Sequence, residues 1–222
     1  MKNKLLLLFF LLGVFFPLSA QESEVLISTS HTSLLLSTSQ GGELKFLYYG
    51  RKLTDADVHA IVSTESGSFS AYPVYGLNCP SESALSVQHE DGNMTLQMEV
   101  IGVETTHQEK ANLTVISLKD KVYPFYVKLC YKAYQDVDVI EAWTEISHKE
   151  KKNVKLNQFA SAYLPVRKGN VWLSSLYGAW ANEARLVQEP LEPGMKVIKN
   201  KDGVRNSHTA HAEVMFSLDG QP

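Results

Sequence analysis

The sequence contains little cysteine: only Cys79 and Cys130 occur among 222 residues. Two thiols cannot build the multi-bridge framework of a small secreted scaffold or a cysteine-rich zinc site. Cys130 falls in a strand-like run and Cys79 in a proline-containing loop, which favours two separate thiols. A bridge between them stays open as an alternative, because an oxidising compartment would permit it.

Positive charge is also scarce, which argues against a nucleic-acid partner. Without residues 1–20, which hold two of the 21 basic residues and none of the 24 acidic ones, the net charge falls from −3 to −5. The single basic cluster, Lys149-Glu150-Lys151-Lys152, contains an acid and is typical of a solvated turn. A polyanion would need a larger basic face.

Long apolar runs are missing except at the start of the chain. Lys2 and Lys4 precede an apolar run from Leu5 to Phe16, and Pro17-Leu18-Ser19-Ala20 ends in small residues. This pattern predicts a signal peptide over 1–20 and a periplasmic or extracellular protein that begins at Gln21. The run is shorter than the roughly 20 residues of a membrane-spanning helix, so we expect no membrane anchor after cleavage.

The motifs of several enzyme classes are absent as well. The sequence has no G-x-S-x-G, no H-E-x-x-H, no phosphate-binding G-x-x-x-x-G-K and no dinucleotide fingerprint, so no cofactor is expected. His208 and His211 could share a metal on a helix, but in a strand they would point to opposite faces. We therefore expect loop hydrogen bonds there and no metal site. Among 24 acids, no catalytic carboxyl pair can be selected.

What the sequence does contain is apolar residues that alternate with polar ones. Met94 to Val100 alternates throughout, and Val122 to Ala133 places Phe125 and Val127 on one face and Cys130 on the other. Further strands are expected over 24–28, 33–38, 43–49, 113–118, 137–146, 154–164, 171–176, 195–198 and 214–218, with a hairpin at Gln40-Gly41-Gly42. We predict an all-β, antiparallel β-sandwich forming one domain over 21–222.

Two further expectations concern local structure. Asp55 to Thr64 is expected to form one helical turn or a loop, because no convincing apolar stripe of helical period occurs after the leader. The turn signal at the end, Asp219 to Pro222, leads to no further strand, so the sandwich is expected to be incomplete at its C-terminus.

Aromatic residues beside Gly or Pro are the best candidates for a ligand surface. Tyr72 and Tyr75 lie in "AYPVYG", and Trp180 lies in "LYGAW". Rings in loops of this kind can stack on sugars. The alternative is that they close the ends of the sandwich.

These segments carry a family resemblance over about Ser33 to Leu218. "FLYYGRKL" at 46–53, "AYPVYG" at 71–76, the run from Leu118 to Trp143 and "LYGAWANEARL" at 176–186 occur in order. Together they resemble the N-terminal domain of glycoside hydrolase family 36, whose best-known members are α-galactosidases. One departure is that Ser207-His208 is not followed by the Asn-Pro-Phe that the family often carries.

The resemblance implies a β-supersandwich that precedes a (β/α)₈ barrel. In such enzymes two barrel aspartates cleave terminal α-galactosides by double displacement with retention. The N-terminal domain would then be a structural and oligomerising module, with no catalytic residue in this chain, so this chain alone would be inactive. It also implies α-galactoside oligosaccharides as substrates and a homo-oligomer at full length. Tyr72, Tyr75, Trp180 and His208 are the substrate-binding candidates.

Two other functions remain open from the sequence. One is a stand-alone carbohydrate-binding sandwich that uses Tyr72, Tyr75 and Trp180. The other is an aldose-epimerase-like supersandwich enzyme, in which His208 and a carboxylate would exchange protons with a sugar.

Overall fold

The computed structural model describes residues 23–39, 41–64, 69–76, 82–166, 169–200 and 210–218, so the predicted signal peptide lies outside the described residues. The chain divides into two compact units, 1–165 and 166–222. In order, the elements are β1 (Ser23–Ser28), β2 (Thr32–Thr38), β3 (Leu44–Arg51), α1 (Asp55–Ser63), β4 (Phe69–Ser70), β5 (Leu85–Gln88), β6 (Met98–His107), β7 (Ala111–Asp120), β8 (Phe125–Tyr134), β9 (Val139–His148), β10 (Lys155–Phe159), β11 (Val171–Ala179), β12 (Asn182–Pro190) and β13 (Ala210–Leu218).

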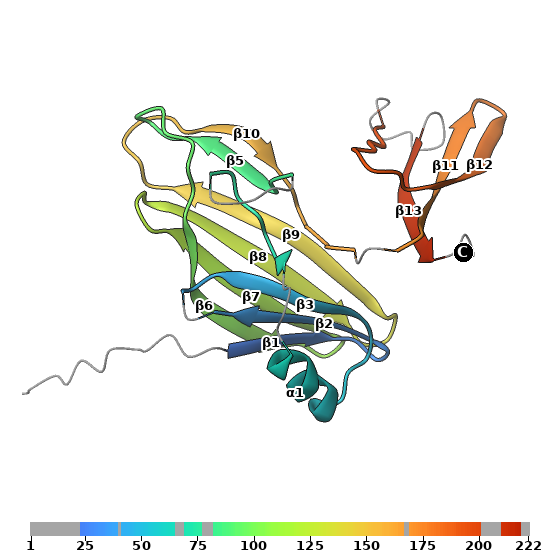
Figure 1. The fold of residues 1–222 in the computed structure, drawn as a ribbon, viewed down its shortest axis with the longest axis horizontal. Coiled ribbons are helices and arrows are strands. Elements are labelled where there is room, and N and C mark those ends of the chain that lie inside the picture. The colour runs from blue at the N-terminus through green and yellow to red at the C-terminus, as the bar shows by residue number, and fades with distance from the viewer. Residues whose placement is uncertain are drawn as a thin grey trace, which may run out of the picture. The chain divides into compact units, whose positions relative to one another are not determined.

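The first unit contains two four-stranded antiparallel sheets, of order β1-β2-β3-β4 and β6-β7-β8-β9. The sheets face one another, as Figure 1 shows. Within each of these sheets consecutive strands pair, and short turns join them except between β3 and β4, where the connection contains α1. Strands β5 and β10, distant in the chain, pair in a separate two-stranded sheet. In the predicted hairpin between β2 and β3, Gly42 has a φ of 78°. Glycine adopts this left-handed conformation with little strain because it has no Cβ. The predicted all-β sandwich is confirmed.

The core lies between these two sheets. Alternate residues of β8 are buried there, and Phe125 and Val127 are both 0% exposed. The first sheet contributes Ile27, Leu34 and Leu36 to the same apolar cluster. Burial of each such side chain contributes about 1.5–3 kcal/mol to folding. Period-two alternation therefore marked the inward face of the sandwich correctly.

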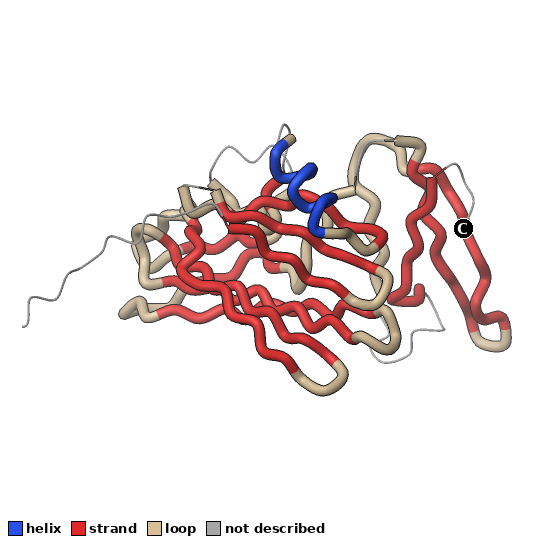
Figure 2. Tube along the Cα trace, turned by 90° about the horizontal axis from the view of Figure 1, so that it is seen from below, coloured by secondary structure: helices blue, strands red, loops and turns tan. Residues whose placement is uncertain are grey.

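Helix α1 corrects the expectation of one helical turn or a loop. It runs for nine residues and begins with a capping box, in which the Thr54 hydroxyl accepts from the Asp57 N–H and the Asp57 carboxylate accepts from the Thr54 N–H. Figure 2 shows the helix lying over the outer face of the first sheet. Its Val58 packs against Leu35 and Leu47. The short apolar contact and the cap together explain a helix that lacks a wide apolar stripe.

One end of the sandwich is joined by hydrogen bonds between the two sheets. Asp138, in the turn between β8 and β9, accepts from the hydroxyls of Thr29 and Thr32 and from the N–H of His31. The Gln135 side chain donates to the Ser28 carbonyl at 2.9 Å. The hydrogen bonds from Thr29, Thr32 and His31 lower the pKa of Asp138, and the Thr29 hydroxyl has the largest effect. The β1–β2 turn and the β8–β9 turn are thereby held together.

Several predicted strand limits were wrong. Only the end of the alternating run 94–100 is strand, because β6 begins at Met98, and residues 195–198 form no strand. Strands β4, β5 and β12 were not predicted. Strand β12 could not be recognised in the sequence, because it is rich in charged and polar residues and almost wholly exposed. Burial therefore imposes no alternation of apolar and polar residues on it.

The second unit contains one antiparallel sheet of order β12-β11-β13. Its central strand, β11, buries Leu173, Ser174 and Ser175. No helix in the described part of the chain is long and apolar enough to cross a membrane.

Candidate functional site

Tyr72 lies inside the core of the first unit. Its side chain is 5% exposed, and its hydroxyl donates to the Ala160 carbonyl at 2.9 Å. Burial raises the pKa of this phenol. The ring therefore takes the packing role that was the alternative to sugar stacking.

Tyr75, three residues later, is presented differently. Its side chain is 49% exposed, while its N–H donates to the Leu85 carbonyl and its carbonyl accepts from the Leu96 N–H. Next to it, Gly76 has a φ of 109°, and a Cβ there would stand 2.7 Å from the Thr95 Cα. The two hydrogen bonds and the tight packing at Gly76 fix the backbone beside an aromatic ring that is half exposed.

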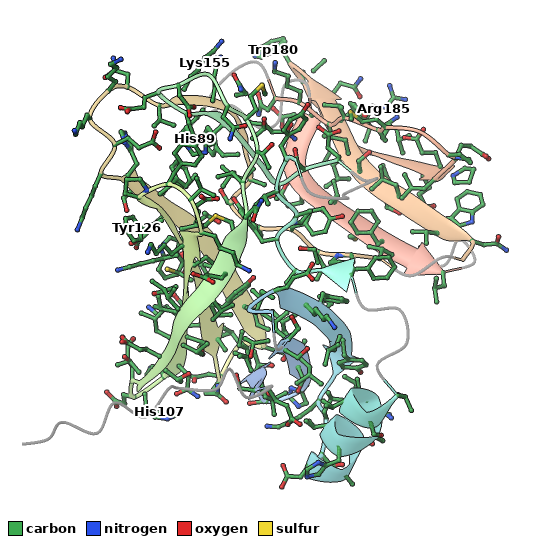
Figure 3. All side chains as sticks on the ribbon, turned by 60° about the vertical axis from the view of Figure 1, so that its left-hand side comes forward. His89, His107, Tyr126, Lys155, Trp180 and Arg185 are labelled. Carbon is green, nitrogen blue, oxygen red and sulfur yellow. The ribbon has the colours of Figure 1, made fainter. Side chains whose placement is uncertain are left out.

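Trp180 is 83% exposed and lies at the tip of the hairpin that joins β11 to β12 (Figure 3). Ala181, beside it, has a φ of 57°. Most left-handed residues in turns are Gly, Asn or Asp, so an alanine in this conformation stores some backbone strain. An almost fully exposed tryptophan in a tight turn has little packing role within its own unit.

Of the two histidines considered as metal ligands, His208 and His211, the structure describes only His211. His208 lies outside the described residues, so its substrate-binding role stays a prediction. His211 contacts Glu213, with 3.4 Å between Nδ1 and Oε2. Within the ranges that the structure describes, no group of three or more His, Cys, Asp or Glu side chains is arranged to hold a metal ion.

A buried polar cluster that the sequence did not reveal lies at the loop end of the first unit. His89 Nδ1 is 2.8 Å from Glu150 Oε1, and both side chains are almost fully buried, at 0% and 2% exposure. The imidazole stacks on the Tyr123 ring with centroids 3.7 Å apart. Figure 3 labels His89 in this region. No motif pointed to the cluster, because its members come from three loops that only the fold brings together.

Hydrogen bonds extend the cluster to the surface. The Tyr123 hydroxyl donates to Asp91 Oδ2 at 2.8 Å and accepts from the Asn93 amide. The pKa of Asp91 is lowered, chiefly by the backbone N–H of Asn93 and then by this hydroxyl. The cluster ties three loops together, and it has the contacts of a structural element rather than of a catalytic pair.

Cys130 is a free, buried thiol on the outward side of β8. Its Sγ lies 3.9 Å from Glu145 Oε1. Burial, together with the nearby carboxylate, raises the pKa of the thiol. A raised pKa disfavours the thiolate, so Cys130 is poorly suited to nucleophilic chemistry. Cys79 lies outside the described residues.

Comparison with known proteins adds a family match. The sequence model of the glycosyl hydrolase family 36 N-terminal domain matches residues 42–221. A curated relative, alpha-galactosidase Mel36A of Lactobacillus acidophilus, is 29% identical over 104 residues, which are 47% of this chain and 14% of that protein.

Solved structures share the fold. A variant of the GH36 alpha-galactosidase AgaA from Geobacillus stearothermophilus, in complex with raffinose, superposes with a TM-score of 0.80 at 19% identity. The match covers 89% of this chain and 32% of that one. The alpha-galactosidase from Lactobacillus brevis gives a TM-score of 0.76 at 20% identity, covering 92% and 32%. The chain thus spans about a third of these structures and a smaller part of the curated relative.

Proposed function

Because this chain belongs to the glycosyl hydrolase family 36 N-terminal domain family, we propose that it is the N-terminal structural and oligomerising domain of an exported α-galactosidase. The complete enzyme would release galactose from terminal α-galactosides with retention. The family match over 42–221 carries this proposal. Catalytic carboxyl groups are expected in the part of the enzyme that this chain does not include.

The substrate class follows from the relatives. The AgaA variants were solved with raffinose and with stachyose, which are α-galactoside oligosaccharides. We extend that class to the complete protein. Export, to the periplasm or beyond the cell, rests on the leader at 1–20.

Tyr75 and Trp180 are the residues of this chain that we propose for sugar contact. Both rings are exposed, at 49% and 83%, whereas Tyr72 packs in the core. A sugar ring stacked on an aromatic face gains apolar contact, and neighbouring polar groups orient it. Either ring alone could extend a sugar site whose reacting groups lie elsewhere.

The test is galactose release by the protein produced from its complete gene. We expect hydrolysis of raffinose and of an aryl α-galactoside, with α-galactose appearing first in the proton NMR spectrum because two inversions retain the configuration. Initial β-galactose would exclude retention, and no release would exclude the hydrolase.

Trp180→Ala then tests the contact. Loss of a stacking ring should raise KM for raffinose by about three- to tenfold, corresponding to roughly 0.5–1.5 kcal/mol. Val137→Ala is the matched control, since Val137 is also exposed (64%) but carries no ring. Equal KM values for raffinose in the two variants would show that Trp180 does not contact the substrate.

A stand-alone carbohydrate-binding domain is the second candidate, and the exposure of Trp180 is the observation that favours it. Such a domain would bind raffinose as an isolated chain, and titration calorimetry of residues 21–222 would detect this. The aldose-epimerase alternative would require mutarotation by the same chain.

A further inference from the structure

Strand β12 is an edge strand of the sheet in the second unit. In the order β12-β11-β13 it pairs with β11 alone. Each residue from Asn182 to Gln188 is exposed, including Leu186 at 52% and Val187 at 41%. An open edge exposes unpaired backbone N–H and C=O groups, and with apolar side chains beside them it is a surface onto which another strand can add.

The edge strand β6 of the first unit is blunted by comparison. In β6 the register shifts between Val100 and Gly102, and the Val100 N–H already donates to the Gly42 carbonyl at 2.8 Å. A bulge of this kind bends a strand and discourages pairing along its edge. In β12 the register with β11 is regular from Arg185 to Pro190.

The side chains of β12 have a charge pattern that is complementary to itself. Arg185, Val187 and Glu189 share one face, because alternate residues of a strand point the same way. Two copies of the strand, placed antiparallel about Val187, would set Arg185 of each copy directly opposite Glu189 of the other. On the reverse face, Leu186 would stand opposite Gln188. This register thus makes two ion pairs and sets no like charges of the two strands directly opposite one another.

We propose that β12 is a homotypic contact, at which two copies of this chain join their three-stranded sheets into one six-stranded sheet about a two-fold axis at Val187. The occupant is a second copy, because the Arg185–Glu189 complementarity is reciprocal, as a two-fold interface requires. Ala184, with a φ of 55°, and Pro190, without an N–H, limit the regular pairing to residues 185–189.

Lys196 is the other charge at this site. Its Nζ lies 2.6 Å from Glu189 Oε1. The contact uses one carboxylate oxygen and leaves Oε2 as a second acceptor for Arg185 of the other copy. Since exposed cross-strand ion pairs are weak, they set the register, while backbone pairing and apolar contact supply most of the association. The contact gives the oligomerising role proposed above a location, and it rests on that proposal.

Cysteine cross-linking of the complete protein tests the register. Directly opposite residues of an antiparallel pair have Cα atoms about 4.5–5.5 Å apart, within disulfide range. Val187→Cys should therefore form a covalent dimer under mild oxidation. Gln188→Cys is the matched control, because two copies of residue 188 would be offset by two positions, about 8 Å apart and beyond that range. The unsubstituted protein, which keeps Cys79 and Cys130, sets the background.

Charge reversal gives an independent readout by sedimentation velocity. Arg185→Glu or Glu189→Arg alone would oppose like charges twice and weaken self-association about tenfold, and the double swap should restore it. Glu183→Lys, outside the regular pairing, should change nothing. Equal cross-linking of positions 187 and 188, or single reversals that leave association unchanged, would overturn the proposal.

Galactose release measured on the same preparations separates this contact from the proposed function. An active enzyme without the Val187 cross-link would refute the β12 contact and leave the hydrolase. A protein that forms the Val187 cross-link but releases no galactose would refute the hydrolase and leave the β12 contact.

Discussion

Replacement of Asp120 should loosen one turn of the sandwich by an amount that the structure allows us to work out. Asp120 ends β7 and is 1% exposed. Its Oδ1 accepts from the N–H groups of Val122 and Tyr123, both at 2.8 Å, and its Oδ2 accepts from the N–H of Gln97 at 2.6 Å. One carboxylate therefore satisfies three backbone donors.

Asp120→Asn keeps the shape and changes one of these bonds. The amide oxygen can still accept from Val122 and Tyr123, but the amide nitrogen then faces the Gln97 N–H, donor against donor. The loss of a charge-assisted bond to a buried donor costs about 2 kcal/mol. Asp120→Ala leaves three donors without an acceptor and should cost about 4 kcal/mol, since about 1–3 kcal/mol is lost per unsatisfied group.

Hydrogen exchange measured by mass spectrometry reports this locally. A change of about 2 kcal/mol corresponds to roughly 30-fold faster exchange. We expect this in Asp120→Asn for the peptide that contains Gln97, and in Asp120→Ala also for the peptide that contains Val122 and Tyr123.

Asp136→Asn is the control, since Asp136 is exposed and stands 4.0 Å from Lys110, a contact worth less than about 1 kcal/mol. If Asp120→Asn exchanges no faster than Asp136→Asn, the Asp120 carboxylate is not the acceptor described here.

Three further outcomes are expected. Tyr72→Phe removes the hydroxyl bonded to the Ala160 carbonyl and should lower the free energy of unfolding by about 1 kcal/mol, measured by urea denaturation, whereas Tyr72→Ala should cost several times more. Gly76→Ala requires an unfavourable φ and places a Cβ against Thr95, so it should cost more than about 1 kcal/mol; no change would mean that the turn differs.

Asp138→Asn keeps the left-handed turn but removes the charge. Because hydrogen bonds from the Thr29 hydroxyl and its neighbours lower the folded-state pKa of Asp138, its stabilisation is present above the unfolded pKa of about 3.9 and is lost as pH falls through the folded value. The urea midpoint of the variant should lie below the parent's at pH 7, with a gap that narrows towards pH 2. A constant gap would refute this.

The sandwich was predictable because its signal is local. A strand with one buried face must alternate, and β8 buries alternate residues from Phe125 to Ala133, with Cys130 as an additional buried residue on its other face. The helix was underestimated, because the Thr54–Asp57 capping box and the contacts of Val58 with Leu35 and Leu47 stabilise it instead of a broad apolar stripe. Strand β12 was missed, because exposure on both faces leaves no alternation to find.

The candidate site shows the same division. The sequence selected Tyr72, Tyr75 and Trp180 on equal grounds, as rings beside Gly or Pro. Only the fold separates them: Tyr72 is buried at 5% exposure, while Trp180 is 83% exposed. Residues at similar loop positions can face inward or outward, because that choice depends on strands distant in the chain.

By itself the sequence determined the fold class, the inward faces of the central strands and the family, since these depend on periodicity and on ordered local segments. Tertiary structure alone decided which aromatic rings are exposed, that His89 meets Glu150 and Tyr123, and that β12 lies at an open edge. Those features arise from contacts between residues tens of positions apart, and their formation depends on how the strands pair, which no local pattern encodes.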